Sequence, residues 1–283
     1  MPDGNSIIDI GKLAEPAKVL IEKISDAVGW VAKPYQIKRI ASAEAEAEKI
    51  KAIAQIEVTE IQNRGLVRMI QIEGKKQENI EQITSKAFAD LNPDAKPNEV
   101  DNEWIANFFE KCDTVSDAEM QSLWAKILAG ESNKPGAFSK RTVNNISSLD
   151  KSEAHLFTTL CRFGWAIGTF TPLIYNIEDD IYKQNGISFS TLTHLESIGL
   201  ITFNNLQGFI RRQLPQKFLI TYYGTQVIVE LPQNVSEMKI GNILLTKMGQ
   251  ELAPICGSQP IIGFVEYVKE YWKKENYMVK GTV

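Results

Sequence analysis

The residue types that could carry out chemistry are few and widely spaced in this 283-residue chain. The two histidines, His155 and His194, have no cysteine or carboxylate at metal-ligand spacing. The three cysteines, Cys112, Cys161 and Cys256, are odd in number and far apart. The sequence contains no glycine-rich phosphate loop, nucleophile elbow or cysteine-histidine motif. We therefore expect no catalytic residue, no metal and no cofactor, and we interpret the chain as a protein other than an enzyme.

Two neighbouring stretches leave alternatives open. Glu178, Asp179 and Asp180 form an acidic cluster that is either a solvated loop, which we favour, or a cation site. The uncharged run 163–177 contains Pro172 and is too short to span a bilayer. We expect this run to be either a buried connection or a docking surface.

The overall composition is that of an ordinary soluble protein, with 43% hydrophobic and 23% charged residues. The formal net charge of -4 gives no general attraction to nucleic acid. The first residues, Met1-Pro2-Asp3-Gly4, lack the basic start and apolar run of a signal peptide. Together with the scattered cysteines, this pattern favours a reducing cytoplasm.

The stretch 34–91 is the element around which the chain is organised, and its pattern predicts one long helix. Pro34 suits the first helical position, and Asn92-Pro93 is a stop signal. Apolar residues recur every eleven positions in rows offset by three and four, so they share one helical face. The rows are Ala47, Val58, Met69, Ile80 and Leu91; Ile50, Ile61, Ile72 and Ile83; and Ala43, Ala54, Gly65 and Ala87. Only Lys76 interrupts the third row.

This apolar face, which we call the seam, needs another helix to cover it. At about 1.5 Å per residue the helix would be on the order of 85 Å long, more than the rest of the chain can bury. The cover is either the chain folding back or a second copy of the protein. We favour a second copy and therefore predict a homo-oligomer. The candidate oligomerisation residues are Ala47, Ile50, Ala54, Val58, Ile61, Gly65, Met69, Ile72, Ile80 and Ile83.

Residues 1–33 form a separate amphipathic segment. Apolar residues recur at three and four positions between Ile10 and Val28, which predicts a helix. One interpretation is a helix on a membrane surface, with aromatic residues at the level of the lipid headgroups. We favour packing against protein instead, because acidic residues balance the lysines on the polar face. The candidate contact residues for either use are Leu13, Leu20, Ile24, Trp30 and Tyr35.

Residues 92–100 contain two prolines and predict a linker, and residues 101–149 predict a small helical domain. Asp101 can cap a first helix, and Ser116 with Glu119 can cap a second one. A third helix is expected after the turn at Pro135-Gly136. The tryptophans and phenylalanines of this region are expected to form a core rather than a site.

From Asp150 onward the pattern changes to alternating helices and strands. Asp150 and Glu153 predict a capping box, Ser190 begins a further helix, and Thr246 caps another. The runs 200–203, 218–223 and 226–231 are rich in β-forming residues. This order of elements resembles a winged helix, a fold commonly used to read DNA.

The charges argue against that use. Residues 150–283 contain 12 basic and 12 acidic residues, and the expected reading helix at 188–197 has no lysine or arginine. A DNA reader needs cations to displace counterions from phosphate. The one local pair of cations, Arg211 and Arg212, is the candidate nucleic-acid contact, in the expected wing.

Two motifs carry a resemblance to known proteins. Residues 123–131 (LWAKILAGE) and 135–142 (PGAFSKRT), together with 33–40 (KPYQIKRI), are similar to an uncharacterised bacterial family. More distantly, the Leu-Trp-x-x-x-Leu element and the Asp-x-x-x-Ala step after it resemble the abortive-infection alpha group of phage-defence proteins. The alanine- and glutamate-rich run 41–49 is also similar to the helical part of stomatin and flotillin proteins, but this likeness is mostly low complexity. None of these resemblances implies catalytic residues.

The sequence therefore predicts a mainly α protein with a winged-helix-like domain at its C-terminal end. The expected parts are an amphipathic segment (1–33), a long coiled-coil-like helix (34–91), a linker (92–100), a small helical domain (101–149) and a winged-helix-like domain with a C-terminal helix (150–283). We expect a non-enzymatic, self-assembling bacterial defence or stress protein, cytoplasmic or peripheral at the inner face of the membrane. The expected partner is a second copy, with another protein or a membrane surface as further candidates. The alternative is a nucleic-acid-binding regulator, which the charges disfavour.

Overall fold

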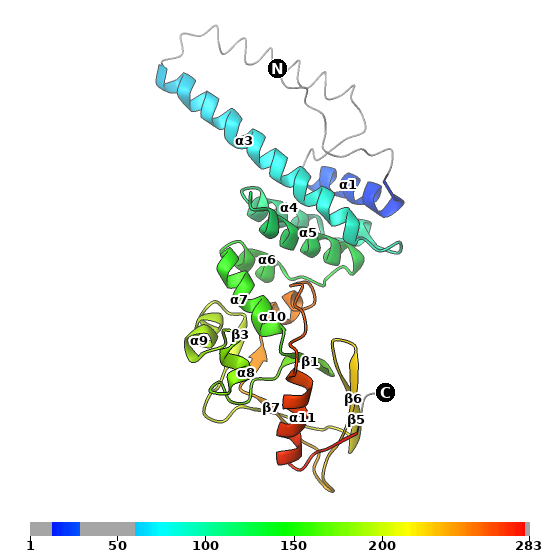
Figure 1. Cartoon of the computed structure of the whole chain (residues 1–283). Coiled ribbons are helices and arrows are strands. Elements are labelled where there is room, and N and C mark those ends of the chain that lie inside the picture. The colour runs from blue at the N-terminus through cyan, green and yellow to red at the C-terminus, as the bar shows by residue number, and fades with distance from the viewer. Residues whose placement is uncertain (1–12, 29–59, 281–283) are drawn as a thin grey trace. The chain divides into compact units, whose positions relative to one another are not determined.

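The computed structural model describes residues 13–28 and 60–280, and the chain divides into two compact units, 1–148 and 149–283. Figure 1 shows that unit 1 is helical and that unit 2 combines helices with strands. The helices of unit 1 are α1 (Glu15–Val28), α3 (Glu60–Ala87), α4 (Asn102–Cys112), α5 (Ala118–Asn133) and α6 (Lys140–Ile146), with short 3-10 turns η2 (Phe88–Asp90) and η3 (Pro97–Glu99). The helices of unit 2 are α7 (Lys151–Cys161), α8 (Asp180–Lys183), α9 (Phe189–Ser197), α10 (Lys247–Leu252) and α11 (Phe264–Lys274). Its strands are β1 (Gly164–Ile167), β2 (Thr169–Pro172), β3 (Ile201–Phe203), β4 (Phe209–Arg211), β5 (Lys217–Tyr222), β6 (Thr225–Glu230), β7 (Met238–Gly241), β8 (Ile243–Leu245) and β9 (Met278–Lys280).

Side-chain caps begin several of these helices where the sequence places them. Asp101 accepts the backbone N–H of Trp104 at 2.8 Å and begins α4. The capping box of Asp150 and Glu153 begins α7, as predicted. For α5 the prediction of Ser116 is wrong by one residue, because Asp117 is the cap. The Asp117 carboxylate accepts hydrogen bonds from two N–H groups of the first turn. Its negative charge also interacts favourably with the positive end of the helix dipole.

Aromatic side chains of α4 and α5 form the core of unit 1. Phe108 stacks on Trp104 and meets Trp124 edge to face, with ring centroids 5.1 and 5.2 Å apart. All three side chains are buried, as expected for a core rather than a site. Helix α1 packs on α4, and α3 packs on α5. Unit 1 is therefore one helical body around α4 and α5.

A five-stranded antiparallel sheet in the order β2-β1-β5-β6-β9 is the framework of unit 2. Strands β5 and β6 form a two-residue hairpin at Tyr223-Gly224, where both residues have positive φ. Two smaller sheets, β3 with β8 and β4 with β7, are separate from it in hydrogen bonding, although β7 and β8 contact β2. The uncharged run 163–177 supplies β1 and β2 and is mostly buried. It is therefore mainly a buried connection, one of the two alternatives that the sequence leaves open.

Helix α11 packs on the five-stranded sheet through aromatic contacts. Trp272 meets Trp165 of β1 edge to face with ring centroids 5.3 Å apart, and Phe264 contacts Tyr222 of β5 at 5.5 Å. Trp272 also donates its indole N–H to the Tyr175 hydroxyl at 2.8 Å. These contacts join residues that are far apart in the sequence, and they hold unit 2 together.

The prediction of a mainly α protein is wrong, because the chain is mixed α/β. The prediction fails for a physical reason: the strands pair over long sequence distances that local patterns do not report. The strands of the 217–230 hairpin, which the winged-helix interpretation groups with the strand after α9, pair with β1 and β9. The strand that follows α9 pairs instead with β8. The hairpin and the α9 strand thus belong to different sheets.

The predicted long helix at 34–91 is described only in its second half. Helix α3 begins at Glu60 and ends at Ala87, where η2 takes over. Residues 34–59, with the candidate seam residues Ala47, Ile50, Ala54 and Val58, lie outside the described residues. The description of the seam therefore rests on α3.

Replacing each of two helical glycines with alanine should change the free energy of unfolding in opposite directions. A Cβ at Gly130 of α5 would lie 2.6 Å from a ring carbon of Phe138, a buried side chain, whereas a Cβ at Gly74 of α3 meets nothing within 4 Å. We expect Gly130→Ala to lower the free energy of unfolding by about 1–3 kcal/mol through overpacking. Gly74→Ala should raise it by about 0.5–1 kcal/mol, because alanine stabilises a helix interior. Urea unfolding of the full chain measures both, and equal stabilisation by the two changes would contradict the packing at Gly130.

Candidate functional site

Helix α3 changes environment along its length, and this change defines the candidate site. From residue 76 to 87 the seam packs against α5 and α4, with Ile83 and Ala87 fully buried. From residue 60 to 75 the same face is open: Ile61 is 73% exposed, Met69 56% and Ile72 47%. We call residues 60–75 the exposed half and residues 76–87 the anchored half of α3. Figure 1 shows the exposed half running on past α4 and α5.

Buried amides fix the anchored half on α5. The Asn79 side chain donates to the backbone carbonyl of Asp113 at 2.7 Å and accepts from Gln121 at 3.3 Å. Gln121 also donates to the Val115 carbonyl at 3.0 Å and accepts from Lys86 at 3.1 Å. Both amide side chains are about 1% exposed. A shift of α3 along α5 would leave these groups unsatisfied inside the protein, so they set the register of the helix.

Lys76 marks the point at which α3 leaves the body of unit 1. Its ammonium group lies 3.3 Å from a carboxylate oxygen of Asp113 and 3.4 Å from one of Glu73. The hydrogen bonds with Asp113 and then Glu73 raise the pKa of Lys76, so the side chain stays charged at neutral pH. The one interruption of the seam therefore has a structural reason. The Lys76 ammonium group pairs there with the carboxylate of Asp113, the C-cap residue of α4.

The exposed half has the geometry of an open helical interface. Ile61, Gly65, Met69 and Ile72 recur at four, four and three positions, so they lie on one face. A Cβ at Gly65 would meet nothing within 4 Å, so a second backbone has room to approach there. Val67 and Ile70 are also about half exposed, but their helical positions place them on the opposite side of α3. The exposed half thus carries a narrow apolar seam and a separate apolar pair.

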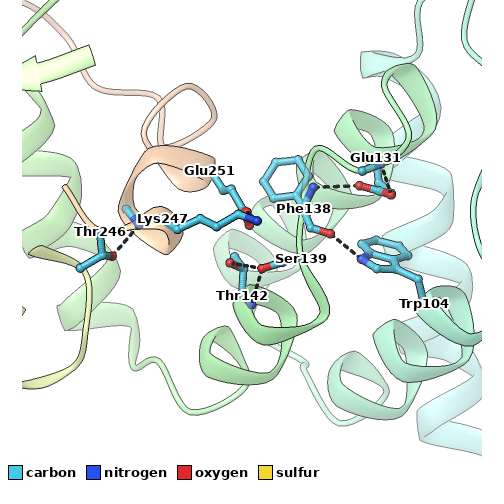
Figure 2. Close-up of polar contacts among 10 residues, drawn as sticks. Trp104, Glu131, Phe138, Ser139, Thr142, Thr246, Lys247 and Glu251 are labelled. Atoms are coloured by element: carbon cyan, nitrogen blue, oxygen red, sulfur yellow. Dashed lines mark hydrogen bonds and ion pairs between the residues drawn. The ribbon is translucent and has the colours of Figure 1, made fainter. Parts of the chain in front are cut away.

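The two motifs at 123–142 have a structural role in unit 1. The buried Glu131 carboxylate accepts the N–H of Gly136 at 2.7 Å and that of Phe138 at 2.8 Å. Figure 2 shows the contact with Phe138. Trp104 donates its indole N–H to the Phe138 carbonyl at 2.7 Å, and Ser139 caps α6 through Thr142. This arrangement closes the loop between α5 and α6. The motif residues therefore fix a turn and form no reactive group.

The N-terminal candidates lie inside unit 1 where they are described. Leu20 and Ile24 are fully buried on the face of α1 that packs on α4, and Leu13 is half-buried. Trp30 and Tyr35 lie outside the described residues. The apolar face of α1 is thus occupied by its own chain.

The nucleic-acid candidates Arg211 and Arg212 both have partners within unit 2. Arg211 donates to the backbone carbonyl of Ile167 and, at 2.7 Å, to the Thr169 hydroxyl. Burial lowers the pKa of Arg211 from its ordinary value. Arg212 lies 3.3 Å from a carboxylate oxygen of Glu237. Arg211 is thus held against the β1–β2 turn, whereas the Arg212 side chain is 77% exposed and its ion pair with Glu237 competes with phosphate.

The remaining titratable candidates are brought into contacts that sequence spacing did not reveal. His194 lies 2.9 Å from a carboxylate oxygen of Glu153, 41 residues away, while His155 is exposed on α7. In the acidic cluster, Asp179 accepts from the Tyr267 hydroxyl at 2.6 Å, and Glu178 pairs with Lys183 at 2.7 Å. Among the side chains that the structure describes, no group of three or more His, Cys, Asp and Glu could hold a metal ion.

Sequence reasoning missed one juxtaposition altogether. Cys161 at the end of α7 and Cys256 after α10 lie close together, because Thr158 of α7 donates to the Cys256 carbonyl and each thiol shifts the pKa of the other. No spacing rule could find this pair, because the residues are 95 positions apart and meet only through the fold of unit 2. Cys112 is buried in unit 1.

Comparisons with known proteins place the chain in a family without assigning a role. Within residues 13–28 and 60–280, no helix is long and apolar enough to cross a membrane. No curated protein and no solved structure matches the chain. The model of one family, described as "Protein of unknown function (DUF2806)", matches residues 63–269, from α3 to α11 and nearly three quarters of the sequence. The chain therefore belongs to the DUF2806 family of proteins of unknown function.

Proposed function

We propose that this protein is a non-enzymatic, self-assembling bacterial defence or stress protein, and that the seam on α3 pairs with a second copy of the chain. The observation that carries the proposal is the continuity of one helical face. Ile83 and Ala87 are buried against α5 and α4, Ile80 is half-buried, and the same face continues into exposed Ile72 and Ile61. Because helices of the same chain cover this face along the anchored half, we expect a further helix to cover it along the exposed half.

The sequence supports a second copy as that further helix. The eleven-residue rows continue upstream at unchanged spacing through Val58, Ala54, Ile50 and Ala47. One helix cannot bury its own continuous seam, but two copies can bury each other's. Charges on the exposed half are mixed in sign: Arg64 pairs with Glu60 at 3.5 Å, and Lys75 pairs at 2.8 Å with Glu78 of the anchored half. Two identical helices therefore meet no block of like charge.

The defence assignment rests on the resemblance of the Leu-Trp-x-x-x-Leu region to the abortive-infection alpha group. In unit 1, residues of that region close the loop between α5 and α6 through the hydrogen bonds of Glu131, Phe138 and Trp104. The resemblance therefore implies a shared scaffold rather than shared chemistry. We place the protein in the cytoplasm. Membrane-surface contact through α1 loses its main support, because Leu20 and Ile24 are buried against α4.

The first prediction concerns assembly. The double change Ile61→Glu with Ile72→Glu places two charges on the seam and should weaken self-association by at least about 3 kcal/mol, more than about a hundredfold in dissociation constant. The folded core should survive, since both side chains are exposed. Sedimentation equilibrium of the full chain measures the mass.

A matched control lies on the same helix. Val67→Glu with Ile70→Glu changes residues of similar exposure on the opposite side, so this variant should keep the wild-type mass. A wild-type chain that is monomeric at micromolar concentration would rule out the proposal.

The second prediction concerns biological activity. In a bacterial host challenged with phages, the seam double variant should lose protection, because assembly is lost. His194→Ala should keep protection, because the proposal assigns the His194–Glu153 pair no chemical step. Plaque counts measure both, with chain levels matched by immunoblot. Loss of protection in His194→Ala while the oligomer stays intact would instead favour an enzyme.

The third prediction concerns nucleic acid, the alternative function. Helix α9 carries no lysine or arginine, and Arg211 and Arg212 are engaged within unit 2. Binding of the full chain to duplex DNA should therefore be weaker than micromolar at about 0.15 M salt. Fluorescence anisotropy with a labelled duplex measures it, and sub-micromolar affinity at that salt would favour the regulator.

A further inference from the structure

The cysteine pair of unit 2 lies in a tightly held part of the fold. Cys161 is the last residue of α7 and is fully buried, whereas Cys256 is half-buried beside exposed Pro254 and Gly257. The two thiols lie near enough that Cys161 lowers the pKa of Cys256 and Cys256 raises that of Cys161. Cys256 is thus the more exposed residue of the pair.

Three contacts hold the loop that carries Cys256 against the end of α7. Thr158 donates its hydroxyl to the Cys256 carbonyl at 3.3 Å, and Arg162 donates to the Gln259 carbonyl at 3.2 Å. The Tyr223 hydroxyl donates to the Cys161 carbonyl at 3.1 Å and is hydrogen-bonded to Ser258. The two cysteines are thus kept together by backbone contacts on both sides, independently of their own thiols.

The surroundings of the two thiols differ in a way that suits different chemical roles. As a thiol, Cys256 donates to the Ala253 carbonyl at 3.2 Å. The pKa of Cys256 is lowered to about 6, first by Cys161 and then by Ser258. The backbone N–H of Ser258 can donate to the thiolate, whereas its hydroxyl hydrogen goes to Tyr223, which itself donates to the Cys161 carbonyl. Thr158 lowers the pKa of Cys256 less than these two residues do. Burial raises the pKa of Cys161 well above its ordinary value, so Cys161 remains the proton donor.

We propose that Cys256 and Cys161 form a peroxide-reactive dithiol site, in which Cys256 is the attacking sulfur, Cys161 is the resolving sulfur, and the product is a disulfide within one chain. The substrate class is a hydroperoxide, of which hydrogen peroxide is the simplest. This site is separate from the seam and does not rest on assembly.

The reaction proceeds in two balanced steps. The Cys256 thiolate attacks one peroxide oxygen, so that an S–O bond forms, the O–O bond breaks and hydroxide leaves; sulfur is oxidised by two electrons and the peroxide is reduced. Cys161 then gives up its proton and attacks the Cys256 sulfur, so that the S–S bond forms and the S–O bond breaks. The departing hydroxide takes the proton as water. Two thiols and one hydrogen peroxide thus give one disulfide and two water molecules.

The test uses the reduced full chain and hydrogen peroxide, followed by quenching, unfolding and alkylation with a maleimide. The expected product is a monomeric chain that carries one maleimide, on Cys112, with a 161–256 cross-linked peptide in the digest. Cys112 is the matched control within the same molecule, because burial raises its pKa and it is the one cysteine of unit 1. Cys112→Ser should form the same disulfide.

Single variants separate the two roles. Cys161→Ser should stop at sulfenic acid on Cys256, which a dimedone-type probe captures, and Cys256→Ser should form neither sulfenic acid nor disulfide. The rate of Cys256 oxidation should rise with pH up to about 6 and then level off, because the thiolate is present above the pKa of Cys256 and lost below it. Each pH unit below that pKa should lower the rate about tenfold. A rate that still rises about tenfold per unit between pH 7 and 9 would overturn the role of Cys256.

The wild-type chain tests the proposal even where a variant does not fold. Three free thiols after peroxide treatment, a disulfide that joins two chains, or a cross-link to Cys112 would each overturn it.

Discussion

The packing of the anchored half of α3 on α5 is the interaction on which the arrangement of unit 1 depends. Apolar burial of Ile83 and Ala87 holds the two helices together, but apolar contacts alone tolerate sliding. The amides of Asn79 and Gln121 remove that freedom, because a shift by one turn would leave buried donors and acceptors unsatisfied, at about 1–3 kcal/mol each. The register so fixed decides where the seam leaves the body, beside the Lys76–Asp113 pair.

Unit 2 is built differently, around aromatic contacts between α11 and a sheet whose strands come from distant parts of the chain. Tyr222 shows how this construction positions other residues. Its hydroxyl donates to the Arg162 carbonyl at 2.8 Å and accepts the Ile261 N–H at 2.7 Å. The hairpin end therefore holds both flanks of the cysteine pair, the end of α7 and the loop after α10. The reactivity proposed for Cys256 follows from the sheet topology and from no local motif.

The features that could be predicted from sequence are those decided within a few residues. Asp101, Asp150 with Glu153, and Thr246 cap helices because their side chains reach N–H groups two or three positions away. The spacing of Ile61, Ile72 and Ile83 correctly describes one helical face, but it does not report which part α5 covers. The residues of a strand likewise do not identify the strand that pairs with it, so the sequence does not place β1, β2 and β9 in one sheet with the hairpin. Cys161 and Cys256 were missed for the same reason.

The central claim is that a second copy covers the exposed half of α3, and hydrogen exchange of the full chain at two concentrations tests it most directly. Amides of the anchored half, 76–87, should be protected at both concentrations, because their cover belongs to the same chain. Amides of the exposed half, 60–75, should be protected at high concentration and should lose protection on dilution, because their cover dissociates. Rapid exchange of residues 60–75 at every concentration would contradict the account, as would full protection in a chain that is monomeric by mass.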